Sequence, residues 1–490
     1  MNSLRITKFL NLTLRRIIFQ VLVVVINLSI FLSCLTNSEK SDTESNKETK
    51  KRDLENIITE KKLVALVENS TISYFIYRGQ PMGLEYEILK RFANEIGVQL
   101  EIRIIQNLDD LIPNLNNLEG DLIACNYTVT KDRLGLINFT LPHMRTSQVL
   151  IQRKPENWEN RKKSDWTKDL LSNTEDLLRK KIHVWGNSSY QKRLAHIQDE
   201  MGDTIYIENI EGNVTSEELI EWVSEGLIDY TITDQNVAQI NESFYDNIDV
   251  SLEISFPQKI AFGIRKESPA LTLRFNAWLE DFMKTSTYSY ILHKYLNMKS
   301  YSQKAQNEYS SLGGGKISQF DDDIKLVTSE YNWDWRLFSA VVYQESKFQE
   351  NLESWAGAYG LMQFMPSVGP TYGVYPDSPP IVQFRGGMKK IIRNIKDWEE
   401  IPDSIQQIKF ALATYNAGLG HILDAQRLAE KYGDDPLVWD ENVEKYMLLL
   451  SKPKYYQDEV CRNGYMRGVE TYKYVRSVFA RYQTYQGVFN

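Results

Sequence analysis

One carboxylate in the C-terminal third of the chain stands in a pattern that suits acid–base chemistry. Leu337, Val341 and Glu345 are spaced four residues apart, which places them on one face of a helix. Glu345 therefore continues an apolar stripe. Partial burial disfavours the charged form of a carboxyl, so its pKa rises and it can act as a general acid near neutral pH. The alternative is a glutamate that ends a core helix and only hydrogen-bonds to the backbone.

Four sequence blocks favour the catalytic interpretation of this glutamate. They occur along the chain in the order Glu345–Ser346, Gly360–Gln363, Tyr415–Gly418 and Glu470–Val475. Together they resemble the signature of the lytic transglycosylase family with the goose-type lysozyme-like fold. The resemblance covers roughly residues 318–485 and implies an all-α lysozyme-like domain that acts on peptidoglycan glycan strands.

The resemblance also implies a role for individual residues. Glu345 matches the catalytic acid/base of the family. The other matched residues are expected to bind or orient the glycan: Ser346, Gln363, Tyr415, Asn416 and Tyr474. Packing is an equally good interpretation of Tyr415.

The implied reaction needs only one carboxylate and no cofactor. Ordinary glycosidases use a second carboxylate, as base or nucleophile. A lytic transglycosylase uses the 6-hydroxyl of N-acetylmuramic acid (MurNAc) instead, which attacks its own anomeric carbon and leaves a 1,6-anhydro sugar. Such intramolecular attack benefits from pre-positioned groups. The sequence offers no obvious second acid, and a lysozyme-like hydrolase is the alternative that product analysis would separate.

No metal site is predicted. Asp321, Asp322 and Asp323 form an acidic cluster, but they precede an apolar helical pattern, and acidic residues are favoured at a helix N-terminus. The five histidines are scattered. Cys125 and Cys461 fall in different putative domains, so each is expected to be a small buried apolar residue.

The N-terminal half of the chain has a different pattern. Short apolar runs alternate with helical segments between residues 61 and 298, which predicts an α/β fold with largely parallel sheets. The blocks Gly120–Ile123, Thr128–Arg133 and Phe139–Pro142 resemble family 3 solute-binding proteins of the amino-acid type. The resemblance implies a two-lobed clamp that closes about a hinge.

Three residues of this clamp are candidates for ligand binding. Arg133 offers a planar fork for a ligand carboxylate, and Thr128 is an added donor. Asp234 matches the family acid that pairs with a ligand ammonium. The expected ligand is an amino acid or a muropeptide. The alternative for Arg133 is an ordinary ion pair at the surface.

The first residues indicate export. Basic residues precede the apolar run Ile17–Leu32, which is shorter than the roughly 20 residues that span a bilayer comfortably. Cys34 follows the run and precedes a polar segment, so this region resembles a bacterial lipoprotein signal with Cys34 as the lipidated residue. An uncleaved membrane helix and plain secretion are the alternatives. The expected location is the cell envelope, lipid-anchored in the outer membrane and facing the periplasm.

The chain thus divides into five predicted parts: a signal peptide at 1–34, a flexible tether at 35–60, a solute-binding-like domain at 61–298, a linker at 299–317 and a transglycosylase domain at 318–490. The formal net charge of −8 and the lack of a basic, aromatic-rich stretch argue against a nucleic-acid partner. The resulting hypothesis is a peptidoglycan-cleaving enzyme with a sensing module. Two alternatives remain, a solute-binding lipoprotein whose C-terminal domain only binds the wall, and a purely structural wall-binding protein.

Overall fold

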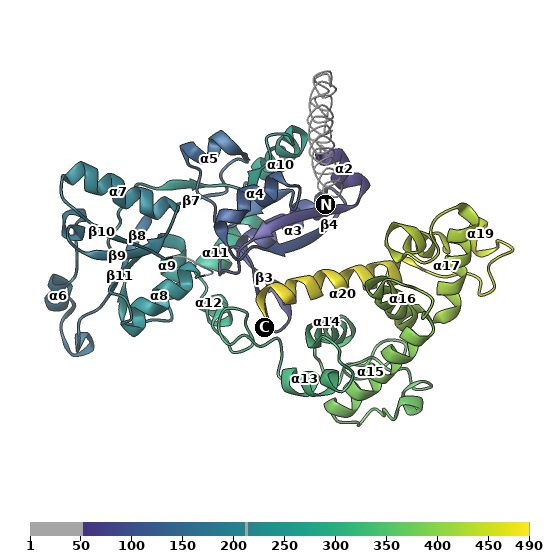
Figure 1. The fold of residues 1–490 in the computed structure, drawn as a ribbon. Helices are drawn as coiled ribbons and strands as arrows, with labels where there is room; N and C mark the ends of the chain where they lie inside the picture. Colours follow the sequence, from purple (N-terminus) through teal and green to yellow (C-terminus); the bar gives the residue numbers. More distant parts are fainter. Residues whose placement is uncertain (1–51, 211–213, 490) are drawn as a thin grey trace, which may run out of the picture. The chain divides into compact units, whose positions relative to one another are not determined.

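The computed structural model describes residues 52–210 and 214–489 (Figure 1). Cys34, the apolar run Ile17–Leu32 and most of the predicted tether lie outside the described residues. Across the described ranges, no helix combines the length and the apolar character needed to cross a bilayer.

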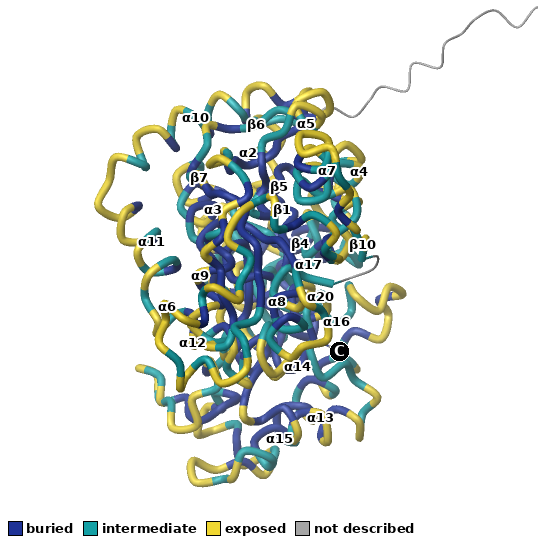
Figure 2. Tube along the Cα trace, turned by 90° about the vertical axis from the view of Figure 1, so that its left-hand side faces the viewer, coloured by how far each residue is buried: buried dark blue, intermediate teal, exposed yellow. Residues whose placement is uncertain are grey.

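The first lobe of the N-terminal half is built on a five-stranded sheet with the order β4-β1-β5-β14-β6. Its inner strand β1 is apolar and almost fully buried, as expected for a strand covered on both faces, and Figure 2 shows it in dark blue. The strands are β1 (Lys62–Val67), β4 (Gln99–Ile104), β5 (Leu122–Ala124), β6 (Asn138–Phe139) and β14 (Gly263–Ile264). The helices of this lobe include α3 (Leu84–Glu95), α4 (Leu111–Asn116), α5 (Lys131–Leu136), α10 (Pro269–Phe282) and α11 (Ser286–Leu296).

The second lobe has its own five-stranded sheet, with the order β10-β9-β11-β8-β12. Its strands are β8 (Gln148–Arg153), β9 (Lys181–Trp185), β10 (Tyr206–Ile210), β11 (Tyr230–Asp234) and β12 (Ile248–Asp249). Its helices include α6 (Lys163–Trp166), α7 (Ser189–Met201), α8 (Ser216–Glu225) and α9 (Gln235–Glu242).

The predicted α/β fold with largely parallel sheets is confirmed. Each sheet contains one strand that runs against the others, β14 in the first lobe and β8 in the second. Both strands belong to the segments that cross between the lobes. Beside them, β7 (Met144–Thr146) pairs antiparallel with β13 (Gln258–Ile260) and forms a two-stranded connection. The chain therefore passes twice between the lobes, as a hinged clamp requires.

The C-terminal domain is all-α, as predicted. Its helices are α13 (Asp321–Ser329), α14 (Trp335–Ser346), α15 (Pro380–Lys396), α16 (Ser404–Ala417), α17 (Leu419–Tyr432), α18 (Glu444–Leu449), α19 (Pro453–Tyr456) and α20 (Val469–Val488). α14 packs against α20, the long yellow helix in Figure 1, and α15 packs against α13 and α16. The three aspartates Asp321, Asp322 and Asp323 form the first turn of α13, which confirms their placement at a helix N-terminus.

The sequence predicted a flexible tether at residues 35–60, but the last part of this segment is folded. Residues Leu54–Thr59 form helix α2, and Ile57 is fully buried. Arg52 anchors the segment, because its guanidinium donates to Asp121 Oδ1 at 2.7 Å. The polar composition of the segment did not indicate these contacts. One buried apolar side chain and one buried ion pair are enough to hold so short a helix against the lobe.

The predicted flexible linker at 299–317 also differs, because this segment is folded against the first lobe. It begins with α12 (Lys299–Ala305) and continues beside β2 (Phe75–Tyr77), where Ser311 N donates to Ile76 O at 2.9 Å. A Cβ at Gly313 or Gly314 would lie 2.3–2.4 Å from the backbone of residues 306–308. These glycines therefore permit close packing of the backbone, and a flexible connector was the wrong interpretation of their run.

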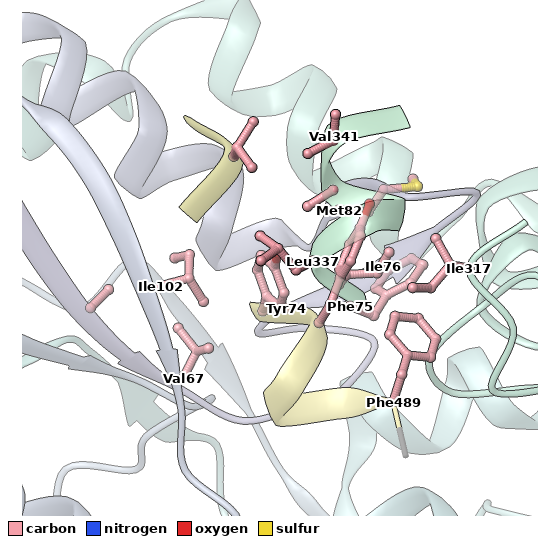
Figure 3. Close-up of a cluster of buried hydrophobic side chains, with 14 of the residues drawn as sticks. Val67, Tyr74, Phe75, Ile76, Met82, Ile102, Ile317, Leu337, Val341 and Phe489 are labelled. Atoms are coloured by element: carbon pink, nitrogen blue, oxygen red, sulfur yellow. The ribbon is translucent and has the colours of Figure 1, made fainter. Parts of the chain in front are cut away.

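The junction between the N-terminal half and the C-terminal domain is apolar. Figure 3 shows Tyr74, Phe75 and Ile76 near Leu337 and Val341 of α14 and near Phe489, which follows α20. The hairpin of β2 and β3 (Gln80–Met82) also reaches the helices, because Tyr485 OH donates to Gly79 O at 3.2 Å. The two halves thus share one continuous hydrophobic core.

Candidate active site and ligand cleft

Glu345 lies in the last turn of α14, on the face that carries Leu337 and Val341. Asp334 starts this helix by accepting a hydrogen bond from Arg336 N at 2.9 Å. Leu337 and Val341 are buried, whereas Glu345 is partly exposed. The predicted apolar stripe ending in a carboxylate is confirmed, and it leaves the carboxyl at the boundary between the core and the solvent.

The carboxyl of Glu345 is held by a tyrosine of a different helix. Tyr474, in α20, donates its hydroxyl hydrogen bond to Glu345 Oε1 at 2.5 Å. Burial raises the pKa of Glu345 to about 7, against the opposing effects of the Tyr474 hydrogen bond and the positive charge of Lys390. A carboxyl with this pKa can give up or accept a proton at neutral pH, which is what general acid–base catalysis requires.

Lys390 of α15 is a site residue that the sequence analysis missed. Its Nζ lies 3.6 Å from the centroid of the Tyr415 ring and donates to Tyr415 O at 3.3 Å. Burial lowers the pKa of Lys390 to about 8, although the charge of Glu345 opposes the change. A sequence signal did exist, because Lys390 lies on the same helical face as Gly386 and Asn394, which are both buried.

Tyr415 and Asn416 come from the C-terminal end of α16. Tyr415 is buried, and its hydroxyl donates to Met362 O at 2.9 Å. Asn416 is exposed, and its Oδ1 accepts from Thr471 Oγ1 of α20 at 2.7 Å. Burial raises the pKa of both Tyr415 and Tyr474, and electrostatic repulsion by the charge of Glu345 raises both pKa values further. The structure thus brings Glu345, Tyr415 and Tyr474 together from three helices.

Gln363 holds a loop through its side-chain amide. Its Nε2 donates to Leu352 O at 3.0 Å and to Gly360 O at 2.9 Å, and its backbone has a φ of +47°. Non-glycine residues rarely adopt this left-handed conformation, so the paired amide stabilises an unfavourable turn. The amide hydrogens of Gln363 therefore serve the loop in this structure.

Ser346 does not join the other predicted residues. It is fully buried, and its hydroxyl donates to Val342 O, one turn earlier in α14, at 3.1 Å. The prediction that Ser346 contacts the glycan directly is corrected here, because the side chain turns into the helix core. Ser and Thr hydroxyls often bond in this way to the carbonyl four residues before them.

The three predicted ligand residues of the N-terminal half line one cavity. It has a volume of 240 Å³ and lies between the lobes. Thr128 and Arg133 line it from the first lobe, and Asp234 lines it from the second, with Trp185 and Tyr190 beside it. A ligand bound here would contact both lobes, as a clamp requires.

Arg133 and Asp234 present opposite charges to this cavity. Arg133 lies with its guanidinium carbon 3.8 Å from the centroid of the Tyr127 ring and donates to Thr128 O at 2.9 Å. No ion pair of Arg133 occurs within residues 52–210 and 214–489. The surface ion pair that was the alternative for Arg133 is therefore not found there.

Asp234 ends β11, where it accepts two hydrogen bonds on one oxygen. Asn126 Nδ2 donates to Asp234 Oδ2 at 2.8 Å, and Tyr190 OH donates to the same atom at 3.2 Å. Asp234 is only 2% exposed, and its Oδ1 has no hydrogen-bond partner among the described residues. Burial raises its pKa to about 7, against the effects of Tyr190 and Arg133.

No metal centre is visible in the part of the chain that the structure describes, since no group of three His, Cys, Asp or Glu residues could hold an ion there. Cys125 and Cys461 are both free thiols, the first buried and the second partly exposed. Cys125 therefore takes the expected buried position, and Cys461 does so only in part.

Two family models match this chain. The model of the bacterial extracellular solute-binding proteins, family 3, matches residues 63–298. The model of the transglycosylase SLT domain matches residues 324–438, which includes Glu345, Gln363, Tyr415 and Asn416. Tyr474 lies beyond that match, in the same helical domain.

Relatives similar to this chain align with most of its length. A protein of Desulfosudis oleivorans named membrane-bound lytic murein transglycosylase F is 29% identical over 430 residues, which are 86% of this chain and 89% of that protein. A protein of Saccharophagus degradans with the same name is 29% identical over 435 residues, covering 87% of this chain and 82% of that protein.

Solved structures similar to this chain include amino-acid-binding proteins. A mutant of ArgBP from T. maritima covers 50% of this chain and 99% of that one, with 20% identity and a TM-score of 0.42. An ancestral arginine-binding protein bound to arginine covers 48% of this chain and 98% of that one, with 21% identity and a TM-score of 0.40.

Proposed function

We propose that this chain, which carries a family 3 solute-binding domain followed by a transglycosylase SLT domain, is a peptidoglycan lytic transglycosylase. It cleaves the β-1,4 bond between MurNAc and N-acetylglucosamine (GlcNAc) and leaves a 1,6-anhydroMurNAc end. The observation that carries the proposal is the Glu345 carboxyl, whose pKa burial raises to about 7 and which Tyr474 holds by a hydrogen bond. The relatives named membrane-bound lytic murein transglycosylase F support the same assignment.

In the first half of the reaction Glu345 acts as an acid. Its carboxyl proton passes to the leaving 4-oxygen of GlcNAc as the bond from that oxygen to the anomeric carbon of MurNAc breaks. Glu345 can hold this proton at neutral pH because of its raised pKa. Tyr474 fixes the rotamer of the carboxyl, which places the acid before the substrate arrives.

In the second half Glu345 acts as a base. The 6-hydroxyl of MurNAc forms a bond to its own anomeric carbon, and its proton returns to Glu345. No water is consumed, so no residue is needed to activate water. Within residues 52–210 and 214–489, the side chains that affect the charge of Glu345 are Tyr474 and Lys390, and none is a second carboxylate.

Substrate orientation is assigned to the residues around Glu345. Asn416 follows Tyr415 at the end of α16 and is exposed, so its amide nitrogen is assigned to the sugar, while its Oδ1 accepts from Thr471 Oγ1. Tyr415 forms one buried wall of the site and bonds to Met362, and the neighbouring Gln363 shapes its loop through two hydrogen bonds to backbone carbonyls. Ser346 supports α14 from inside and has no assigned contact with the sugar.

The N-terminal half is assigned as a binding module for an amino acid or a short wall peptide. The two oppositely charged groups Arg133 and Asp234 suit the carboxylate and the ammonium of such a ligand. The proposed domain limits are 61–298 and 318–490, and both family matches lie inside them. The proposed location is the cell envelope, where lipidation of Cys34 would anchor the chain, in the outer membrane facing the periplasm.

Digestion of purified peptidoglycan with the full chain in detergent tests this proposal. The variants are Glu345→Gln, which keeps the shape of the side chain, and Glu350→Gln, which removes an exposed carboxylate five residues away. We expect the wild type and Glu350→Gln to release anhydro-muramyl products identified by mass spectrometry, and Glu345→Gln to release none.

Two other results would contradict the proposal in different ways. Products with ordinary reducing ends would make the enzyme a lysozyme-like hydrolase. Equal cleavage by the Glu345→Gln variant would remove Glu345 from the mechanism. No cleavage by any of the three proteins would favour a wall-binding protein without activity.

A further inference from the structure

Five carboxyl side chains line the cavity between the lobes, and three of them are not exposed, whereas Asp109 and Asp132 are. Glu68 directly follows β1, Glu217 lies in the first turn of α8, and Asp234 ends β11. Glu68 is 9% exposed and Asp234 only 2%, so two of the three are well removed from solvent. We refer to Glu68, Glu217 and Asp234 as the acidic cleft residues.

Two buried oxygen atoms of the acidic cleft residues have no hydrogen-bond donor among the residues that the structure describes. Glu217 Oε1 accepts from Thr71 N at 3.0 Å and from Thr71 Oγ1 at 3.1 Å, but its Oε2 is buried without a partner among the described residues. The same holds for Asp234 Oδ1. Leaving a buried acceptor unsatisfied costs about 1–3 kcal/mol, so both atoms are positioned to accept from a ligand.

The positive groups that line the cavity do not neutralise these carboxyls. Lys192 is exposed and forms an ion pair with Asp132 at the rim. Arg133 affects Asp234 only from a distance, as one of the smaller influences on its pKa. With Asp132 paired to Lys192 and Asp109 exposed, the three less exposed carboxyls face one available guanidinium, that of Arg133.

The electrostatics of the cavity supports the same conclusion. Burial, followed by repulsion from Glu217, raises the pKa of Glu68 well above its usual range. Burial also raises the pKa of Glu217. Carboxyls that repel one another in a low-dielectric space retain protons unless a cation lies between them. A cation from the ligand would take the place of those protons.

We propose that the cleft binds an α-amino acid whose side chain carries a second cationic group, in the class of lysine and arginine. Arg133 receives the α-carboxylate, Asp234 receives the α-ammonium through Oδ1, and Glu68 with Glu217 receives the cation of the side chain. This inference rests on the proposed function of the N-terminal half as an amino-acid-binding module, and it adds the ligand class.

The size of the cavity agrees with a single amino acid. Its volume of 240 Å³ is smaller than the roughly 300–1,000 Å³ typical of sites for drug-sized ligands. Glu68 and Glu217 also line a neighbouring cavity of 580 Å³, so they stand where the two spaces meet. A long side chain can therefore extend past Asp234 toward them without crowding.

Isothermal titration calorimetry of the full chain with three free amino acids tests the proposal. The probes are L-lysine, L-arginine and L-norleucine, which resembles lysine but has no side-chain ammonium. Binding energies of buried charge pairs predict that norleucine binds at least about tenfold more weakly than lysine.

Three variants test where the cationic group of the ligand side chain binds. Glu68→Gln and Glu217→Gln keep the side-chain shape and are each expected to weaken lysine binding by roughly tenfold or more, with norleucine binding unchanged. Glu221→Gln is the matched control, because Glu221 is on the same helix as Glu217 but lines only the neighbouring cavity. It should change lysine affinity by less than about twofold.

The possible results separate this inference from the enzyme assignment. Equal affinity for lysine and norleucine would overturn the second cation site while leaving the clamp in place. Heat from none of the three amino acids would overturn the whole ligand assignment. Neither result would change the interpretation of the peptidoglycan digest, because that experiment reports on Glu345 alone.

Discussion

The protonation of a single side chain, Glu345, is expected to control the pH dependence of cleavage. A general acid must carry its proton at the start of the reaction, and burial raises the pKa of Glu345 to about 7. Activity should therefore be highest below pH 7 and fall as the pH rises, to about one tenth of the plateau at pH 8. Initial rates on purified peptidoglycan, with circular dichroism at each pH to verify folding, would show this. A rate that stays constant up to pH 9 would contradict the assignment.

A second residue-scale prediction concerns Lys390, whose positive charge lowers the pKa of Glu345. The Lys390→Met variant loses this charge, so the pKa of Glu345 rises and the alkaline fall in activity moves to higher pH. The expected displacement is about 0.5–1 pH unit. Lys389→Met is the matched control, because Lys389 is the exposed neighbour on α15. Superimposable pH profiles for wild type and Lys390→Met would show that Lys390 only fills space.

At the scale of single elements, the tip of the hairpin of β2 and β3 is predicted to pack tightly against the C-terminal domain. Gly79 at its tip has a φ of +71°, and a Cβ there would lie 2.6 Å from Tyr343, 2.8 Å from Phe348 and 2.9 Å from Tyr485. Gly79→Ala should therefore destabilise the protein by about 1–3 kcal/mol through crowding, in addition to backbone strain.

Gly97→Ala isolates the backbone part of this effect. Gly97 has nearly the same φ, +72°, but no atom lies within 4 Å of a Cβ placed there. Urea unfolding of both variants and the wild type gives the comparison. Equal losses of stability would mean that the hairpin tip is not packed against α14 and α20 as described.

The elements also show which features could be predicted from sequence. The periodicity around Leu337, Val341 and Glu345 was sufficient to place α14 and its carboxylate, because a four-residue spacing has one simple structural meaning. The alternating pattern likewise predicted the two α/β lobes. Composition misled at Gly313, since a glycine that permits close packing and a glycine in a flexible loop look the same in a sequence.

Contacts between distant segments were beyond such reasoning. Lys390 is near Tyr415 only because α15 packs on α16, and Glu68 faces Glu217 only because the lobes meet. The burial of Ser346 depends on which side of the last turn of α14 faces the core. Local sequence patterns do not contain these tertiary relations.

At the scale of the whole molecule, the shared core predicts cooperative unfolding. One contiguous apolar cluster contains residues of β1, of α14 and of α20. α20 itself carries Tyr474 near its start and packs Gly487 beside Ile104 of β4 near its end. We expect one main thermal transition that both halves share.

Ligand addition makes this prediction sharper. L-lysine at about one hundred times its dissociation constant should stabilise the binding module by about 2.7 kcal/mol, and a shared transition would move as a whole. Differential scanning calorimetry with and without L-lysine measures this. Two separate transitions, only one of which moves with the ligand, would contradict a common core.

The central claim is that a hydroxyl of the substrate, and not water, attacks the anomeric carbon once Glu345 has protonated the leaving oxygen. Digestion of peptidoglycan by the full chain in heavy-oxygen water tests it most directly, with the oxygen content of each new glycan end read by mass spectrometry. We predict anhydro ends that contain no heavy oxygen, with all cleavage lost in Glu345→Gln. Reducing ends that each carry one heavy oxygen atom would contradict the account and would establish a hydrolase.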